Sequence, residues 1–307
     1  MDEKYDEMNE KFLSSNIDDL ISFYNFFHNR KELVDWMQHR PKSEPTIHRV
    51  SGENDIVVVI PTADANSKRL KLCSERIFSG LNQIIVESVK PLDKYFNYSH
   101  NVNIGVSEAI KTNPKWIIIS NDDMVPGDPP HRLISEIRSH DSDLEYALFT
   151  RPEGEYHSFQ RFIGQPNMLY SIATKLHPNR YRSIRFSLWK RFDLRYIDAL
   201  YRGSSGLLSR LTYKTLKVHL LTGSFTILSR NYIQSHKQIL DETFINGGED
   251  SDLSLRLHED LNKIGYIDYK IGDRIGTSLG SGWARIIRNV VNEIYLSYKI
   301  EKGLLRI

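Results

Sequence analysis

Two acidic segments carry the residue types and spacing that could do chemistry in this chain. The first, residues 120–124, contains Asn121, Asp122 and Asp123 and follows the apolar run 116–119. Carboxylate oxygens bind Mg²⁺ or Mn²⁺ and leave coordination positions open for phosphate oxygens. This segment therefore suits a divalent cation that neutralises a departing diphosphate.

The second acidic segment, residues 247–252, contains Glu249 and Asp250. It precedes apolar residues whose spacing of three and four predicts one buried helical face that ends near Gly265: Leu253, Leu257, Leu261 and Ile264. Asp250 would then lie at the positive end of a helix, which favours the ionised form that a general base needs. Both segments also have a structural interpretation, because acidic pairs form turns after strands and Asp caps helices.

The elements that must position these segments alternate between strand and helix. Apolar runs at 55–60, 83–86 and 116–119 predict strands, and 67–79 and 99–111 predict helices between them. Such alternation favours a parallel sheet, whose ligands bind beyond the carboxyl ends of the strands. Those ends carry polar residues, in chain order Pro61, Thr62, Ala63 and Asp64, then Glu87 and Ser88, then Asn121, Asp122 and Asp123.

The chain resembles glycosyltransferase family 2, the nucleotide-sugar-dependent enzymes of GT-A fold. The resemblance covers about residues 55–282 and fails over 151–217. It rests on six blocks: Val57–Thr62, Ile84–Ser88, Asn103–Ile110, Asn121–Asp123, Gly223–Thr226 and Glu249–Arg256. The last block is the most specific of these. The resemblance implies an α/β, mostly parallel Rossmann-like sheet flanked by helices.

The resemblance also implies roles for individual residues. Asp123, with Asp122 beside it, would bind Mg²⁺ or Mn²⁺, and Asp250 would be the catalytic base with Glu249 next to it. The nucleotide of a UDP, GDP or dTDP sugar would contact Pro61, Thr62, Ala63, Asp64, Glu87, Asn103, Asn121 and Asp122. Many relatives have a metal-binding His where this chain reads Gly272–Gly276. We therefore expect either that the metal is held more weakly or that Arg274 contacts the diphosphate directly.

The flanking segments differ in pattern from the sheet region. We expect an N-terminal helical extension over 1–50, the glycosyltransferase domain over 51–282, and a C-terminal amphipathic helix over 283–307. Within the domain, residues 151–217 form a basic and aromatic insertion on the acceptor side. In the last helix Ile287, Val290 and Val291 share an apolar face, and we expect Arg288, Asn292 and Lys299 to fall outside it.

Composition indicates a soluble enzyme with a net charge of +2. The acidic N-terminus does not predict a secretory signal, no apolar run is long enough for a membrane span, and the single Cys73 favours a reducing cytoplasm. The basic insertion and the last helix are of a kind that binds an anionic membrane surface, which predicts peripheral attachment at the inner face. The alternatives are a solvated insertion and a helix that packs on the domain. Nucleic acid is the less favoured partner.

We therefore predict an inverting, metal-dependent glycosyltransferase that transfers a sugar to a hydroxyl of a glycan, protein or lipid-linked acceptor. A nucleotidyltransferase of related fold would use the same strand-end acids but release pyrophosphate. A non-catalytic protein that binds membrane or nucleic acid would not need Asp250. A phosphohydrolase is disfavoured, because the first strand is not followed directly by the usual nucleophilic acid.

Overall fold

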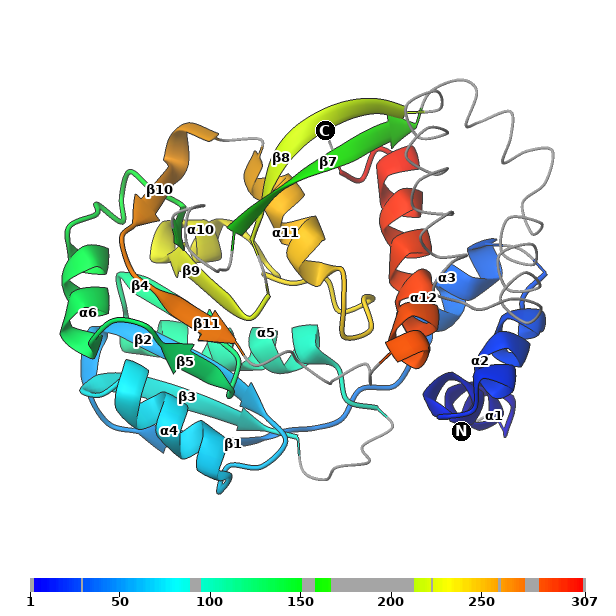
Figure 1. The fold of residues 1–307 in the computed structure, drawn as a ribbon, viewed down its shortest axis with the longest axis horizontal. Coiled ribbons are helices and arrows are strands. Elements are labelled where there is room, and N and C mark those ends of the chain that lie inside the picture. Colours follow the sequence, from blue (N-terminus) through cyan, green and yellow to red (C-terminus); the bar gives the residue numbers. More distant parts are fainter. Residues whose placement is uncertain are drawn as a thin grey trace. The chain divides into compact units, whose positions relative to one another are not determined.

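The computed structural model describes residues 3–28, 30–88, 95–150, 158–166, 213–221, 223–258, 261–273 and 282–305. The chain divides into two compact units. The sheet unit comprises residues 40–160 and 219–280, and the terminal unit comprises residues 1–39, 161–218 and 281–307. Figure 1 shows the elements of both units with their labels.

Helices and strands alternate through the sheet unit. The α-helices of the described chain are α1 (Glu3–Leu13), α2 (Ile17–Phe23), α3 (Arg30–His39), α4 (Lys68–Ile77), α5 (Tyr98–Ala109), α6 (Pro130–Arg138), α10 (Arg230–Ser235), α11 (Glu249–His258) and α12 (Gly282–Glu301). The strands are β1 (Thr46–Val50), β2 (Glu53–Thr62), β3 (Leu81–Glu87), β4 (Trp116–Ser120), β5 (Met124–Pro126), β6 (Ala147–Thr150), β7 (Ser158–Pro166), β8 (Tyr213–Leu221), β9 (Phe225–Ser229), β10 (Ile264–Ile267) and β11 (Ile271–Asp273).

The main sheet has seven strands in the order β1-β3-β2-β4-β9-β6-β10. Strand β2 pairs in parallel with both β3 and β4, and β6 pairs in parallel with β10. Strands β1 and β9 run antiparallel to their neighbours. The fold is therefore α/β with a mixed, mostly parallel sheet flanked by helices, as predicted, and it is compatible with a Rossmann-like arrangement.

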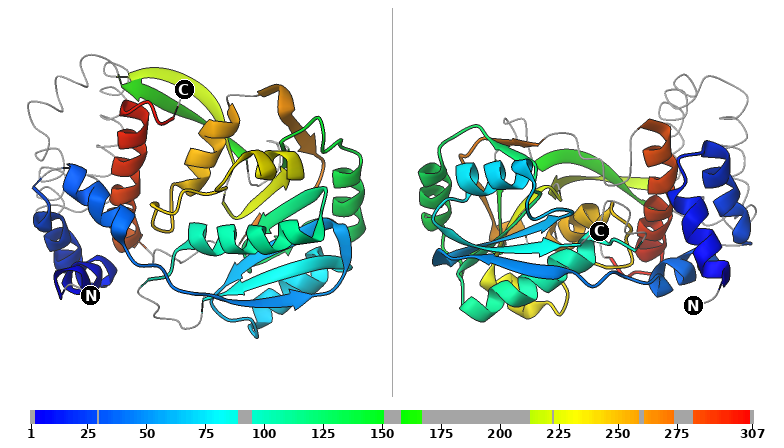
Figure 2. Two further views of the ribbon diagram at one scale, coloured as in Figure 1. Left: turned by 180° about the vertical axis from the view of Figure 1, so that it is seen from behind. Right: turned by 90° about the horizontal axis from the view of Figure 1, so that it is seen from below.

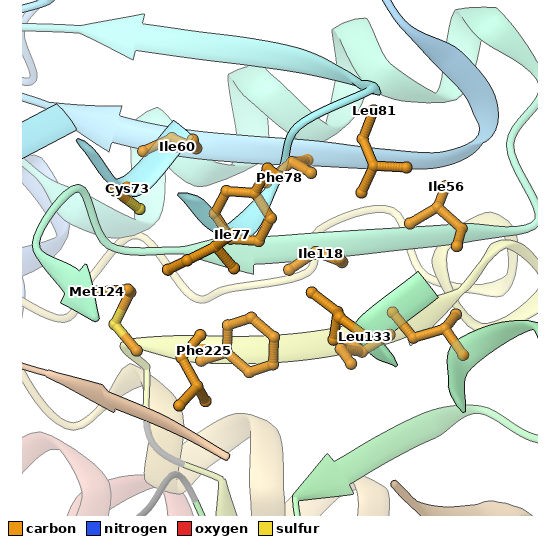
Figure 3. Packing of buried hydrophobic residues seen from close by; sticks show 14 of the residues in the cluster. Ile56, Ile60, Cys73, Ile77, Phe78, Leu81, Ile118, Met124, Leu133 and Phe225 are labelled. Atoms are coloured by element: carbon orange, nitrogen blue, oxygen red, sulfur yellow. The ribbon is translucent and has the colours of Figure 1, made fainter. Parts of the chain in front are cut away.

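Both faces of the central strands are apolar because each face is covered by helices. On β2, Ile56, Val58 and Ile60 pack toward α4 and α6, and Figure 3 shows Ile60 beside Cys73 and Ile77 of α4. The alternate residues Val57 and Val59 pack on the opposite face with residues of α5, α10 and α11. The right-hand view of Figure 2 shows α4 and α5 on opposite sides of the sheet. This burial on both sides explains the continuous apolar runs in the sequence.

Local signals in the sequence start the two crossover helices at the carboxyl edge of the sheet. The hydroxyl of Ser67 accepts a hydrogen bond from the Leu70 amide, and the Asn97 side chain accepts one from the His100 amide. These caps satisfy amide groups that the first turn of a helix leaves without partners. Helix α5 then packs closely on the sheet at Gly105, where an added Cβ would lie 2.8 Å from Cγ2 of Val86.

The helix predicted from Leu253 to Ile264 is shorter in the structure. Helix α11 ends at His258, a short 3-10 helix spans Leu261–Lys263, and Ile264 begins strand β10. The segment is extended because it pairs in parallel with β6 and forms the edge strand of the sheet. Without this pairing, the backbone groups on that side of β6 would lack strand partners. Gly265 permits this pairing, since an added Cβ would lie 2.7 Å from Cδ2 of Leu148.

Residues 46–50 differ from the predicted helical extension. They form β1, which pairs antiparallel with β3, so the sheet begins before the predicted boundary at residue 51. Residues 3–39 do form helices, as expected. In the terminal unit these helices enclose an aromatic cluster in which Phe12, Phe23 and Trp36 contact one another, with ring centroids 4.9–5.6 Å apart.

The last helix uses its apolar face within the terminal unit. Ile287, Val290 and Val291 of α12 are buried, and α12 packs against α2 and α3. Arg288, Asn292 and Lys299, which we expected outside the apolar face, are buried as well, so α12 is packed beyond its apolar face. The apolar side of α12 therefore packs on protein, which is the alternative to an interface with membrane.

Charge rather than apolar burial explains the position of Arg288. Its guanidinium donates to the carbonyls of Phe12, Leu13 and Ser14 at 2.8–2.9 Å, and so satisfies the carboxyl end of α1. Most of the predicted basic insertion, 151–157 and 167–212, lies outside the described residues. In the part of the chain that the structure describes, no helix has both the length and the apolar character needed to cross a bilayer.

Candidate active site

The carboxyl ends of β2, β3 and β4 meet at one edge of the sheet. Thr62 at the end of β2 pairs with Glu87 at the end of β3, and the chain after β4 reaches the same edge. The antiparallel strand β9 begins there too, because Ser120 pairs with Phe225. The backbone N–H of Asn121 donates to the carbonyl of Ser224 at 2.8 Å, which fixes the acidic segment against the start of β9.

Asp122 is buried and links two other elements of this edge. Its Oδ2 atom accepts a hydrogen bond from Thr62 Oγ1 at 2.7 Å. The same oxygen lies 3.1 Å from Nε and 3.0 Å from Nη2 of Arg69, in the first turn of α4. Burial of a carboxylate is costly unless such partners compensate for the lost water. Asp122 thus holds the end of β2 and the start of α4 together, while Asp123 beside it is half-buried.

Glu87 holds the loop that follows β2. Its Oε1 accepts from the backbone N–H of Ala65 at 2.9 Å, and its Oε2 lies 2.7 Å from Nε2 of His48 on β1. These two contacts, the Ala65 amide first, lower the pKa of Glu87 and keep it ionised. The described contacts of Glu87 therefore fix the segment that we predicted to line a nucleotide pocket.

The two acidic segments come together around Tyr98, at the start of α5. The Tyr98 hydroxyl donates to the carbonyl of Gly223 at 2.5 Å. Burial raises the pKa of Tyr98 well above its ordinary value, and the negative charges of Glu249, Asp250, Asp122 and Asp123 raise it further. Gly223 also lies beside Glu249 and Asp250, and the neighbouring Ser224 accepts a hydrogen bond from the Asn121 amide, so residues far apart in the sequence share one region.

Glu249 and Asp250 occupy different environments although they are adjacent. Asp250 is half-buried, and its carboxylate accepts from the amides of Ser251 at 2.7 Å and Gly223 at 3.4 Å. Glu249 is 7% exposed, and its Oε2 has no hydrogen-bond partner in the described structure. Burial and then the charge of Asp250 raise the pKa of Glu249 to about 8. At neutral pH Glu249 is therefore mainly protonated.

The loop before α11 is held by side chains from the start of α5. The Asn97 amide donates to the carbonyls of Glu242 and Phe244 at 2.9 and 3.0 Å. Asn246, in the left-handed backbone region with φ of 53°, accepts from the Tyr98 N–H at 2.9 Å. These contacts place Glu249 and Asp250 beside Tyr98.

Several predicted nucleotide contacts have structural partners. The Asn103 amide donates to the carbonyl of Leu240 at 2.8 Å and accepts from its N–H at 3.0 Å, so it helps to hold the same loop. Asn121 is half-buried, and its carbonyl accepts from the thiol of the buried Cys73.

The other predicted nucleotide contacts lie around the end of β2 or outside the description. Pro61 is buried, whereas Ala63 and Asp64 are exposed in the turn after it. Asp64 accepts from the Asn66 amide at 2.8 Å, which shapes this turn. Arg274 lies outside the described residues.

The carboxylates at the strand edge fit only a sparse metal site. Among the residues that the structure describes, no three His, Cys, Asp or Glu side chains gather in a way that could hold a metal ion. Oδ2 of Asp122 is already engaged by Thr62 and Arg69. Mg²⁺ commonly binds through one or two carboxylates and completes its shell with water and phosphate oxygens. Asp123, with Asp122, fits a cation of that kind.

Three residues at this edge were not identified from the sequence: His48, Arg69 and Tyr98. Each lies in a different element from the carboxylate that it contacts or faces. Their types are common at protein surfaces, and nothing in their local sequence marks them. The contact between Tyr98 and Gly223 depends on strand order.

A scan against protein-family models finds no family whose model matches this chain, and a search of curated proteins finds no relative. The functional interpretation therefore rests on the residues and geometry of the site.

Proposed function

We propose that this chain is an inverting glycosyltransferase of GT-A type that uses a nucleoside-diphosphate sugar. One observation carries the proposal: the backbone of Gly223 and Ser224 hydrogen-bonds to both acidic segments, through the Asn121 amide of the first and the Asp250 carboxylate of the second. The group lies at the carboxyl edge of a mostly parallel sheet, where ligands of such sheets bind. Sugar transfer requires a general base and a positive charge that neutralises the diphosphate. The second acidic segment offers the base, and the first offers a site for a cation.

Asp250 is the base in this proposal. Its hydrogen bonds from two backbone amides favour the ionised form, and the half-exposed position leaves it within reach of a substrate. Glu249 holds a proton at neutral pH because it is buried beside the charge of Asp250. In this proposal the neutral Glu249 can act as a hydrogen-bond donor, and Asp250 has the separate role of base.

Asp250 would take the proton of the acceptor hydroxyl as its oxygen attacks the anomeric carbon. The bond from that carbon to the phosphate oxygen breaks on the opposite face, and a nucleoside diphosphate leaves with the bonding electrons. This single displacement inverts the configuration at the anomeric carbon. A Mg²⁺ or Mn²⁺ ion at Asp123, when bound, would supply positive charge to the diphosphate.

The donor would bind along the ends of β2 and β3. The turn after Thr62 and the Glu87 carboxylate form this edge, and Glu87 holds the turn through the Ala65 amide. We propose a UDP, GDP or dTDP sugar as donor and a hydroxyl of a glycan, protein or lipid-linked molecule as acceptor.

Product analysis tests the reaction class. The protein is incubated with a panel of nucleotide sugars and with nucleoside triphosphates, in Mg²⁺ or Mn²⁺, together with candidate acceptors. Release of a nucleoside diphosphate with a glycosylated product supports the proposal. Release of pyrophosphate from a triphosphate would instead assign the nucleotidyltransferase, which would use the same strand-end acids.

The substitution Asp250→Asn tests the base. We expect turnover to fall by roughly 10²- to 10⁴-fold while donor affinity is retained, because the amide keeps the shape of the side chain but cannot take a proton. Glu249→Gln should cost less, and Glu75→Gln on the exposed side of α4 serves as the control. Near-normal turnover in Asp250→Asn together with an inactive Glu249→Gln would move the base to Glu249.

A further inference from the structure

Arg69 is a positively charged residue that contacts the strand-end carboxylate of Asp122. It is the second residue of α4, and both its Nε and its Nη2 lie within 3.1 Å of Asp122 Oδ2. The Asp122 side chain is 10% exposed, whereas the Arg69 side chain is 51% exposed. The buried carboxylate thus holds a guanidinium whose other side faces solvent.

Most of the hydrogen-bonding capacity of Arg69 remains available. A guanidinium has five N–H donors in a planar fork, which suits phosphate as well as carboxylate. In the described structure the guanidinium of Arg69 hydrogen-bonds only to Asp122, and it does so through a single oxygen. Donors remain for a second, external acceptor.

The charge around the site requires such a cation if the ligand is anionic. Three aspartates, Asp122, Asp123 and Asp250, lie at the same edge of the sheet, whereas the neighbouring Glu249 is mainly protonated at neutral pH. A diphosphate brought to this edge would be repelled unless positive charge lay nearby. Arg69 supplies that charge in the first turn of α4, where the backbone amides of the helix also favour an anion.

We propose that Arg69 binds the diphosphate of the nucleotide donor and that Asp122 positions its guanidinium for this contact. The proposal rests on the proposed function for the identity of the ligand, a nucleoside diphosphate. It gives Asp122 a role distinct from that of Asp123: Asp122 orients Arg69 and Thr62, and Asp123 would bind the cation. The binding of one anion would then depend on a buried carboxylate that does not itself contact the anion.

Calorimetric titration of the full chain with inorganic pyrophosphate, UDP and uridine in Mg²⁺ tests the proposal. We expect Arg69→Gln to weaken the binding of pyrophosphate and UDP by roughly 10- to 100-fold, the loss typical of a charge-assisted hydrogen bond. The affinity for uridine should not change. Arg76→Gln, an exposed arginine on the same helix, is the matched control and should bind all three as the wild type does.

Removing Arg69 also leaves the negative charge of Asp122 without its partner. That charge alone would weaken the binding of an anion. The double variant Asp122→Asn/Arg69→Gln removes this ambiguity, because it has the same net charge as the wild type and leaves no unpaired buried carboxylate. It should bind pyrophosphate roughly 10- to 100-fold more weakly than Asp122→Asn, which retains Arg69. If Arg69→Gln does not fold, the comparison of the double variant with Asp122→Asn replaces it.

Equal pyrophosphate affinity in Asp122→Asn and in the double variant would overturn the proposal, as would a wild-type chain that binds neither pyrophosphate nor UDP. The proposed function can fail separately. If pyrophosphate binding depends on Arg69 while no nucleotide sugar is turned over, the anion site stands and the glycosyltransferase assignment does not.

Discussion

Burial of Glu249 should make the stability of this protein depend on pH in a specific way. Glu249 is 7% exposed, its Oε2 lacks a partner in the described structure, and Asp250 lies next to it. Burial and then the charge of Asp250 raise its pKa from 4.5 to about 8. The substitution Glu249→Gln keeps the size and hydrogen-bonding shape of the side chain and removes the titration.

The sign and size follow from proton linkage. Between pH 4.5 and about 8 the folded protein keeps a proton on Glu249 that the unfolded chain has released, so this residue lowers the free energy of unfolding as pH rises. Each pKa unit corresponds to about 1.4 kcal/mol, which gives a total of roughly 5 kcal/mol across the window. Above about pH 8 both states are ionised, and the contribution is constant.

Urea denaturation at a series of pH values measures the effect. The quantity of interest is the unfolding free energy of Glu249→Gln minus that of the wild type, because other titrating groups largely cancel in it. We expect this difference to grow by roughly 4 kcal/mol in favour of the variant from pH 5 to pH 8. Glu75→Gln on the exposed side of α4 should show no such change.

The coupling to Asp250 gives a second measurement. Because the charge of Asp250 is the second cause of the raised pKa, Asp250→Asn should lower the pKa of Glu249 and narrow the pH window, while the effect of burial remains. A stability difference that stays flat from pH 5 to pH 8 would show that Glu249 ionises normally in the folded protein. That result would remove the reason for treating Glu249 as the neutral member of the pair.

Two further predictions concern packing in the two units. Gly105→Ala should lower the unfolding free energy by roughly 1–3 kcal/mol, because the new methyl group would lie 2.8 Å from Val86 Cγ2 and would press α5 away from the sheet; an unchanged urea midpoint would contradict this. Arg288→Gln should destabilise the terminal unit by roughly 2–4 kcal/mol, because three carbonyls at the end of α1 lose a charged donor. Hydrogen exchange in α1 should rise in that variant but not in Arg285→Gln, an exposed arginine on α12.

The sequence by itself determined the central sheet and the position of the acidic segments along it. Apolar runs such as 55–60 and 116–119 predict strands that are buried on both faces, and the helical stretches between them require parallel crossovers. Parallel order places the ends of β2, β3 and β4 at one edge, so the proximity of Thr62 to Asp122 followed from local patterns alone.

Only the tertiary structure decided how the remaining residues join this edge. Strand β9 inserts antiparallel beside β4, and this order brings Gly223, Tyr98 and Asp250 together across more than a hundred positions of sequence. The end of α11 and the extended conformation of Ile264 also depend on a partner strand, because strand pairing outweighs a local helical pattern.

The protonation state of Glu249 and the ion pair between Arg69 and Asp122 also depend on the tertiary structure. The pKa of Glu249 depends on burial by surrounding chain, and the contact of Arg69 with Asp122 depends on where α4 begins relative to β4. Spacing along a sequence specifies which face of an element a side chain occupies. It does not specify the solvent exclusion or the neighbouring charges that set a pKa, since these come from segments distant in the chain.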